Sequence, residues 1–168
     1  MYVTPTLMIS ARRKPLKSVD RLRYAVQNGA PIHSTVELLI HLLRDQADVL
    51  IGILREAVTR VDQIEDDLLA GRLDAKRGKL GQLRRVMVRL QRLMAPEPAA
   101  LFRLLQRPPA WIADADLQDL RQSSEEFSAV LTDMASLQER IKLLQEEIAA
   151  MINEASSKSL YTLTVFTV

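Results

Sequence analysis

A seam of apolar residues between positions 36 and 68 constrains this 168-residue chain more than any other feature. Ten apolar residues recur there at alternating spacings of four and three: Val36, Ile40, Leu43, Ala47, Leu50, Leu54, Ala57, Val61, Ile64 and Leu68. This spacing is the a/d pattern of a coiled-coil helix. Ser34 and Glu37 form a capping box before the seam, and Gly71 follows it, so the sequence predicts one long helix between them.

A second seam predicts a return helix that makes a hairpin with the first. It follows Asp74, a candidate N-cap, and consists of Leu80, Leu83, Met87, Leu90 and Met94. The run Ala-Pro-Glu-Pro at 95–98 interrupts this helix, and helical sequence resumes over 99–106.

From Asp114 or Asp116 no proline or glycine occurs as far as Val168, which predicts one very long helix of about 80 Å. One apolar stripe keeps the heptad rhythm: Leu117, Leu120, Phe127, Leu131, Met134, Ile141, Ile148 and Ile152. A second stripe lies beside it: Val130, Leu137, Leu144 and Met151. A helix with two stripes contacts two neighbours, and this much apolar surface predicts partner chains or further segments that cover it.

The N-terminal part is different in kind. Residues 2–9 are β-prone but include Pro5, so they predict one short edge strand. A short helix is expected over 18–28, with Ser18 as its N-cap and Gly29 at its end. The predicted fold class is therefore mainly α, with long antiparallel coiled-coil helices, one very long stalk helix and a short N-terminal strand.

Composition excludes several classes of function. The chain has no cysteine, so disulfides, thiolate metal sites and cysteine nucleophiles are excluded. It contains no phosphate loop, nucleophile elbow or zinc-binding helix motif, and nothing in it predicts an enzyme. His33 and His41 are eight residues apart and are expected to be ordinary histidines. No apolar stretch reaches the length of a membrane span.

Charge alternates by segment. Residues 33–71 carry three basic and eight acidic residues (−5), residues 72–107 carry ten and two (+8), and residues 108–155 carry three and ten (−7). Alternating blocks favour antiparallel helices with complementary faces. A nucleic-acid footprint is the competing interpretation of Arg84, Arg85, Arg89 and Arg92, but acidic segments flank them and no aromatic residue interleaves with them, so no nucleic-acid partner is predicted.

One acidic run invites a metal interpretation. Asp62, Glu65, Asp66 and Asp67 lie near the predicted tip of the hairpin and could collect hard cations such as Mg²⁺, although acidic helix tips are usually only solvated. The uncharged tail at 160–168 predicts the first turns of a truncated membrane helix, or alternatively a frayed or strand-like terminus.

Several stretches together resemble the CorA-type divalent metal-ion transporter family, and within it the ZntB-like zinc branch. They are residues 12–23, 45–50, 61–69, 83–96, Trp111 before the long helix, 143–147 and 157–164. The resemblance implies a homopentamer at the cell (inner) membrane, with the last helix lining a central pore. Mg²⁺, Co²⁺ or Zn²⁺ would be the transported ions, with no covalently bound cofactor.

The resemblance also implies that this chain is a fragment on the cytoplasmic side. The Gly-Met-Asn signature, the second membrane helix and most of an α/β domain are absent. The expected domains are a remnant of the α/β domain (1–32), an antiparallel helical hairpin (33–112) and a stalk helix running into the first membrane helix (113–168).

By register, the resemblance places three residues on one face at the cytoplasmic end of the pore: Leu160, Leu163 and Thr167, with Ser157 one turn earlier as a weaker candidate. Apolar rings there would gate by dewetting. These side chains could equally pack helix against helix. The alternative function is a soluble structural or adaptor coiled coil without a transport role.

Overall fold

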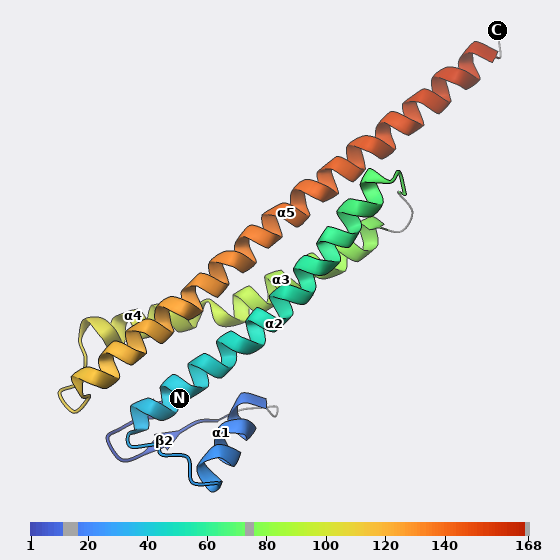
Figure 1. Ribbon diagram of the computed structural model, residues 1–168. Coiled ribbons are helices and arrows are strands. Elements are labelled where there is room, and N and C mark those ends of the chain that lie inside the picture. Colours follow the sequence, from blue (N-terminus) through green and yellow to red (C-terminus); the bar gives the residue numbers. More distant parts are fainter. Residues whose placement is uncertain (12–16, 73–75, 167–168) are drawn as a thin grey trace. The chain divides into compact units, whose positions relative to one another are not determined.

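The computed structural model describes residues 1–11, 17–72 and 76–166; the side chains of residues 76–77 and 160–166 lie outside this description. The elements, in order, are β1 (Tyr2–Val3), β2 (Met8–Ile9), α1 (Lys17–Gln27), α2 (Thr35–Leu69), α3 (Lys76–Met94), α4 (Pro96–Gln106) and α5 (Asp114–Phe166) (Figure 1). The predicted mainly α fold with one very long helix is confirmed.

The N-terminal segment is a hairpin rather than the single strand predicted. β1 and β2 pair antiparallel, with Tyr2 opposite Ile9 and Val3 opposite Met8. Between them, the Thr4 N–H donates to the Leu7 carbonyl at 2.8 Å, and the Leu7 N–H donates to Thr4 Oγ1 at 3.0 Å. Pro5 lies in the turn, where its missing N–H costs no ladder hydrogen bond. Strands of two residues are too short to show the alternation by which a strand is recognised.

Helix α1 ends as predicted but does not begin as predicted. Gly29 has φ +79°, and the Gly29 N–H and Ala30 N–H close the last turn on the carbonyls of Val26 and Ala25. Ser18 is buried inside the helix, which already includes Lys17, so the prediction that Ser18 is the N-cap is wrong.

The predicted cap of α2 is confirmed with one difference. Ser34 Oγ accepts a hydrogen bond from the Glu37 N–H at 3.0 Å, as in a capping box. The Glu37 carboxylate accepts from the His33 N–H, one residue earlier than the usual partner. At the other end, Gly71 has φ +74°, and the Arg72 N–H donates to the Asp67 carbonyl. Helix α2 is unbroken from Thr35 to Leu69.

The seams that predict the helices are their buried faces. Nine of the ten seam residues of α2 are buried, and the tenth, Leu54, is half-buried. In α3, Leu80, Leu83 and Met87 are buried, while the predicted N-cap Asp74 lies outside the described residues. Because coiled-coil spacing brings these side chains onto one stripe, their burial follows directly from the sequence.

The chain forms two compact units, which divide the long helices between them. Unit 1 comprises residues 1–53 and 93–132, and unit 2 comprises residues 54–92 and 133–168. The units are defined by which residues contact each other, whereas the predicted domains begin and end where helices do. The predicted boundaries at 32/33 and 112/113 therefore stay a prediction.

Unit 1 has a core built from three helices. The first turns of α2 pack against α4, the start of α5 and Ile112 just before α5. The buried residues of this core are Val36, Leu39, Ile40, Leu43, Leu101, Ile112 and Leu120. Polar contacts support the same packing, since Ser34 Oγ donates to Asp116 Oδ2 at 2.8 Å and Thr35 Oγ1 donates to the Thr4 carbonyl at 2.6 Å.

Unit 2 contains the second half of α2, most of α3 and the second half of α5. Both predicted stripes of α5 are buried in it as far as Ile148, through Met134, Leu137, Ile141, Leu144 and Ile148, whereas Met151 is half-buried and Ile152 is exposed. Gln138 Nε2 also donates to Gln91 Oε1 at 2.9 Å, which joins α5 to α3. Arg140 joins α5 to α2 in the same unit, so this part of α5 has two helical neighbours, as the sequence predicts.

Candidate functional site

The end of α5 changes from a packed helix to an exposed one within a single turn. Ile148 is fully buried, whereas Ile152 is 40% exposed, and the residues from 153 to 159 are all exposed. The helix nevertheless continues to Phe166. Lys158 Nζ and the Glu154 carboxylate form an ion pair at 2.7 Å on this segment, which lowers the pKa of Glu154 and raises that of Lys158.

Of the predicted pore residues, only Ser157 lies in the part of this segment whose side chains are described. Ser157 is exposed on α5. Leu160 and Leu163 lie on the helix, but their side chains are outside the description, and Thr167 lies outside the described residues altogether. Among the described residues, no helix is long and apolar enough to cross a membrane. The pore-lining role of these four residues stays a prediction.

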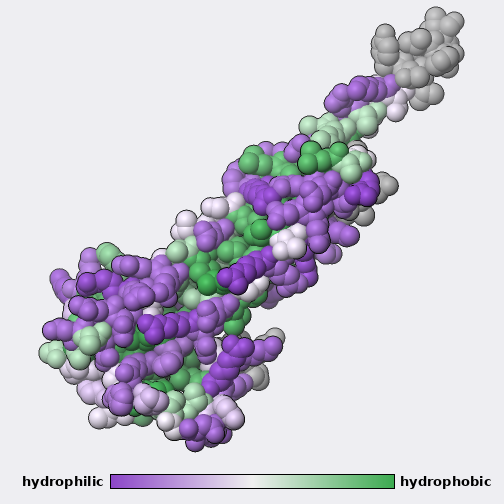
Figure 2. All heavy atoms as spheres, in the orientation of Figure 1, coloured by the Kyte–Doolittle hydropathy of each residue, from purple (hydrophilic) through white to green (hydrophobic). Residues whose placement is uncertain are grey.

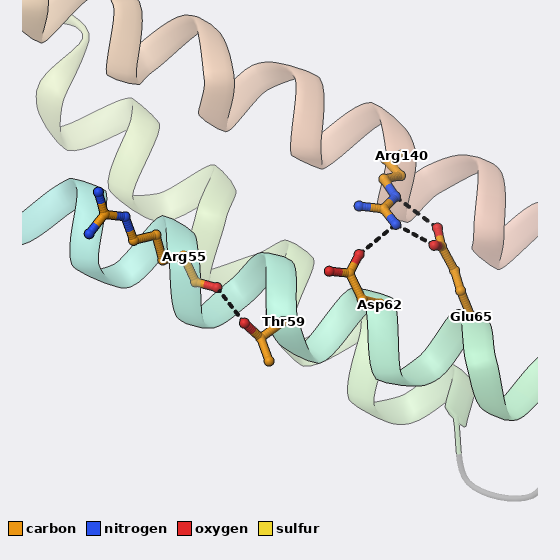
Figure 3. Close-up of polar contacts among 5 residues, drawn as sticks. All are labelled: Arg55, Thr59, Asp62, Glu65 and Arg140. Atoms are coloured by element: carbon orange, nitrogen blue, oxygen red, sulfur yellow. Dashed lines mark hydrogen bonds and ion pairs between the residues drawn. The ribbon is translucent and has the colours of Figure 1, made fainter.

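In unit 2, an arginine on α5 reaches two carboxylates on α2. Arg140 Nε donates to Glu65 Oε1 at 2.8 Å, and Arg140 Nη2 donates both to Asp62 Oδ1 at 2.7 Å and to Glu65 Oε2. Figure 3 shows the guanidinium between the two carboxylates, which lie on successive turns of α2. The hydrogen bonds to Glu65 and Asp62 raise the pKa of Arg140 further above its ordinary value. The arrangement is a two-carboxylate clamp on one cation.

This clamp occupies half of the predicted acidic metal cluster. A divalent cation at Asp62 and Glu65 would have to displace the Arg140 guanidinium. Asp67 pairs with Arg72 at 2.9 Å, and Asp66 is exposed. Among the described residues, no group of three or more histidine, cysteine, aspartate or glutamate side chains is placed to hold a metal ion. Cation collection at these four acids stays a prediction.

Four arginines of α3 gather around a groove of about 720 Å³ in unit 2. The lining consists of Gly81, Arg84, Arg85, Val88, Arg89, Arg92 and Gln145. Arg84 Nη1 donates to Gln145 Oε1 at 3.4 Å, and Arg85 Nε donates to the Gly81 carbonyl at 3.2 Å. Both acceptors are neutral. Among the described residues, Arg72 of the basic block pairs with Asp67 of the acidic block 33–71, whereas the Arg140 clamp joins two blocks of net negative charge.

Two further residues of interest carry no clear signal in the sequence analysis. Arg140 is one of three basic residues in the acidic block 108–155, and that isolation is the signal that could identify it. Glu97, at the start of α4, has a buried Oε2 without a hydrogen-bond partner among the described residues, and burial raises its pKa. Nothing in its local sequence distinguishes it from a solvated first-turn glutamate. His41 is exposed on α2.

Comparison with known proteins gives consistent matches over nearly the whole chain. A family model described as CorA-like Mg²⁺ transporter protein matches residues 1–168. Zinc transport protein ZntB of Yersinia enterocolitica is 26% identical over 165 residues, which cover 98% of this chain and 50% of that protein. ZntB of Photorhabdus laumondii is 24% identical over the same coverage, and ZntB of Klebsiella pneumoniae 22%.

A solved structure has the same fold. The full-length CmaX protein superposes with a TM-score of 0.81 at 23% identity, covering 92% of this chain and 47% of that one. The chain thus spans about half the length of the proteins that it matches.

Proposed function

Because this chain belongs to the CorA-like Mg²⁺ transporter family, we propose that it is the cytoplasmic helical part of a divalent-cation transporter. The family match over residues 1–168 is the observation that carries the proposal. The family match covers both compact units and the whole of α5, so the proposal does not rest on a coiled-coil pattern alone.

The transported ion is proposed to be Zn²⁺, Mg²⁺ or Co²⁺. The family description names Mg²⁺, and the ZntB relatives are described as zinc transport proteins. Hard cations such as Mg²⁺ prefer oxygen ligands, and Zn²⁺ also accepts them. A chain without cysteine offers oxygen and imidazole groups and no thiolate.

Helix α5 is proposed to lead into the pore, with Ser157, Leu160, Leu163 and Thr167 on the face that lines it. Support comes from the place where α5 stops packing. The helix is held by two neighbours up to Ile148 and then extends for a further 18 residues, to Phe166. Residues 153–159 of this extension are all exposed, which is compatible with a helix that leaves the packed part of unit 2 and continues into a pore.

Association of five copies at the cell membrane, with this part on the cytoplasmic side, completes the proposal. Large apolar side chains remain exposed on several helices, among them Val86, Leu93, Phe102, Leu143 and Ile152. On the face in Figure 2, hydrophobic surface is interspersed with hydrophilic surface. Exposed apolar surface of this kind is suited to contacts between copies.

Uptake into proteoliposomes tests the proposed function. The protein from the complete reading frame is reconstituted, and Mg²⁺, Co²⁺ and Zn²⁺ are added outside vesicles that contain a cation-sensitive dye. Saturable uptake of at least one cation, above that of protein-free vesicles, is expected. Uptake no faster than in protein-free vesicles for all three cations would overturn the proposal.

A further inference from the structure

The arginine-lined groove of unit 2 is a second candidate binding surface, independent of cation transport. Arg84, Arg85, Arg89 and Arg92 are all exposed on α3 and all line the same hollow. Guanidinium groups stay protonated at every physiological pH, so four positive charges share this groove. Among the described residues, no carboxylate lines it.

These charges are not neutralised within the described part of the chain. Arg84 and Arg85 contact only neutral oxygens, of Gln145 and Gly81, and the described carboxylates form no ion pair with Arg89 or Arg92. By contrast, Arg140 in the same unit is clamped by two carboxylates. Unit 2 therefore supplies carboxylate partners to Arg60, Arg72 and Arg140, whereas the four arginines of the groove form no ion pair with a described carboxylate.

The spacing of the arginines indicates what kind of anion fits. Arg85, Arg89 and Arg92 follow each other at four and three residues and so lie on one helix face. They extend over about 10 Å along the axis of α3, which is longer than one phosphate group can contact. Guanidinium groups bind phosphate oxygens in a bidentate manner, so successive arginines suit successive phosphates.

The floor and size of the groove favour a small ligand. Gly81 has no side chain, and a Cβ there would lie 3.7 Å from Gln145 Nε2, an amide donor at the edge of the groove. The hollow, of about 720 Å³, is open to solvent and is large enough for a small anion. No aromatic side chain of the described residues lines the groove, which disfavours stacking with nucleic-acid bases.

We propose that this groove binds a small anion carrying two or three linked phosphate groups, held by Arg84, Arg85, Arg89 and Arg92. The site is formed by α3 with Gln145 of α5, all within unit 2. It goes beyond the proposed transport function and does not depend on it.

Calorimetric titration with inorganic tripolyphosphate tests the site in metal-free buffer with chelator at about 0.1 M salt. Saturable binding is expected, with R85Q/R89Q weakening it at least about tenfold, because charge-assisted hydrogen bonds to phosphate are lost. The matched control is R44Q/R55Q, which removes the same charge from exposed arginines of α2 outside the groove and should keep the affinity within about twofold.

Three results would overturn the proposal. The first is absence of saturable binding at millimolar tripolyphosphate. The second is an equal loss in R44Q/R55Q, which would show attraction by overall charge. The third is evidence of another occupant. Tighter binding of a 12-nucleotide single-stranded DNA would assign the groove to a nucleic acid. A change of oligomeric state in R85Q/R89Q by light scattering, with no tripolyphosphate binding, would assign it to another copy of the chain. Unchanged circular dichroism of both double variants verifies folding.

Discussion

Arg140 and Glu65 are 75 residues apart in the chain, yet Arg140 Nε donates to Glu65 Oε1 at 2.8 Å. A second guanidinium nitrogen, Nη2, reaches Asp62 as well, so one side chain of α5 joins two turns of α2. The Glu65 side chain is 29% exposed and that of Arg140 39%, which leaves part of the clamp open to solvent.

Loss of this clamp is expected to destabilise unit 2. R140Q leaves two carboxylates facing each other without a cation, and should reduce the free energy of unfolding by about 1 kcal/mol, since partial exposure weakens each bond. The free energy of unfolding of R140K should lie between those of R140Q and the natural chain, because lysine lacks the planar guanidinium group that binds a carboxylate through two nitrogens. Urea unfolding measures the effect, and R121Q, at an exposed arginine of the same helix, is the control. Equal stability of R140Q and R121Q would show that the clamp contributes nothing.

Burial of Glu97 predicts a loss of stability as pH rises, which the substitution E97Q should remove. Burial raises its pKa above the ordinary value of 4.5, so the folded state binds the proton more tightly than the unfolded state. Glu97 therefore destabilises the fold as pH rises through its folded pKa, and the penalty is absent below about pH 4. E97Q should melt at a higher temperature than the natural chain at pH 7 and at the same temperature near pH 4. D48N, at an exposed carboxylate of α2, should show no such difference. A constant offset between E97Q and the natural chain at all pH values would contradict the assignment to ionisation.

The packing of α5 predicts two very different effects of the same substitution. Ile141 is fully buried in unit 2, whereas Ile152 is 40% exposed on the same helix. I141A should cost about 2–5 kcal/mol through lost burial and the cavity that it leaves, while I152A should cost less than about 1 kcal/mol. Denaturant unfolding of both variants makes the comparison. Similar losses of unfolding free energy in I141A and I152A would mean that α5 is still packed at Ile152, contrary to the structure.

Two glycines predict stability changes of opposite sign. Gly52 lies inside α2 with no atom within 4 Å of an added Cβ, so G52A should stabilise the helix by about 0.5–1 kcal/mol. Gly71 has φ +74°, which an L side chain adopts only with strain, so G71A should destabilise by about 1 kcal/mol. Thermal melting of the two variants tests this. A gain from G71A would show that α2 ends differently from the structure.

Much of the fold follows from periodicity, because burial in coiled-coil helices repeats with the sequence. Spacing alone assigns the seam residue Leu50 to the core, and likewise Ile141 on the stalk stripe, and both are buried. The N-terminal hairpin has no such signal, because its two-residue strands carry no period. The assignment of Ser18 as a cap is wrong because a cap is set by where the preceding backbone leaves the helix, which residue type alone does not fix.

The candidate sites are less predictable than the fold. Segment charges predict complementary faces, but an average over a block conceals which side chain makes the contact. Arg140 pairs with α2 from within a block of net negative charge, and Arg89 of the basic block has no acidic partner among the described residues. The pore-lining face at Leu160 and Leu163 rests on resemblance, since helical spacing states which residues share a face and not what that face contacts.

Thiol modification of single-cysteine variants during cation uptake tests most directly whether α5 leads into the cation pathway. The chain has no cysteine of its own, so S157C, L160C, L163C and T167C each introduce one thiol. A positively charged methanethiosulfonate reagent should slow uptake by the reconstituted protein in these variants. T162C, about 200° around the helix from position 160, serves as the control and should keep its rate. Unchanged uptake in all four variants, or equal inhibition of T162C, would contradict a pore-lining role for this face of α5.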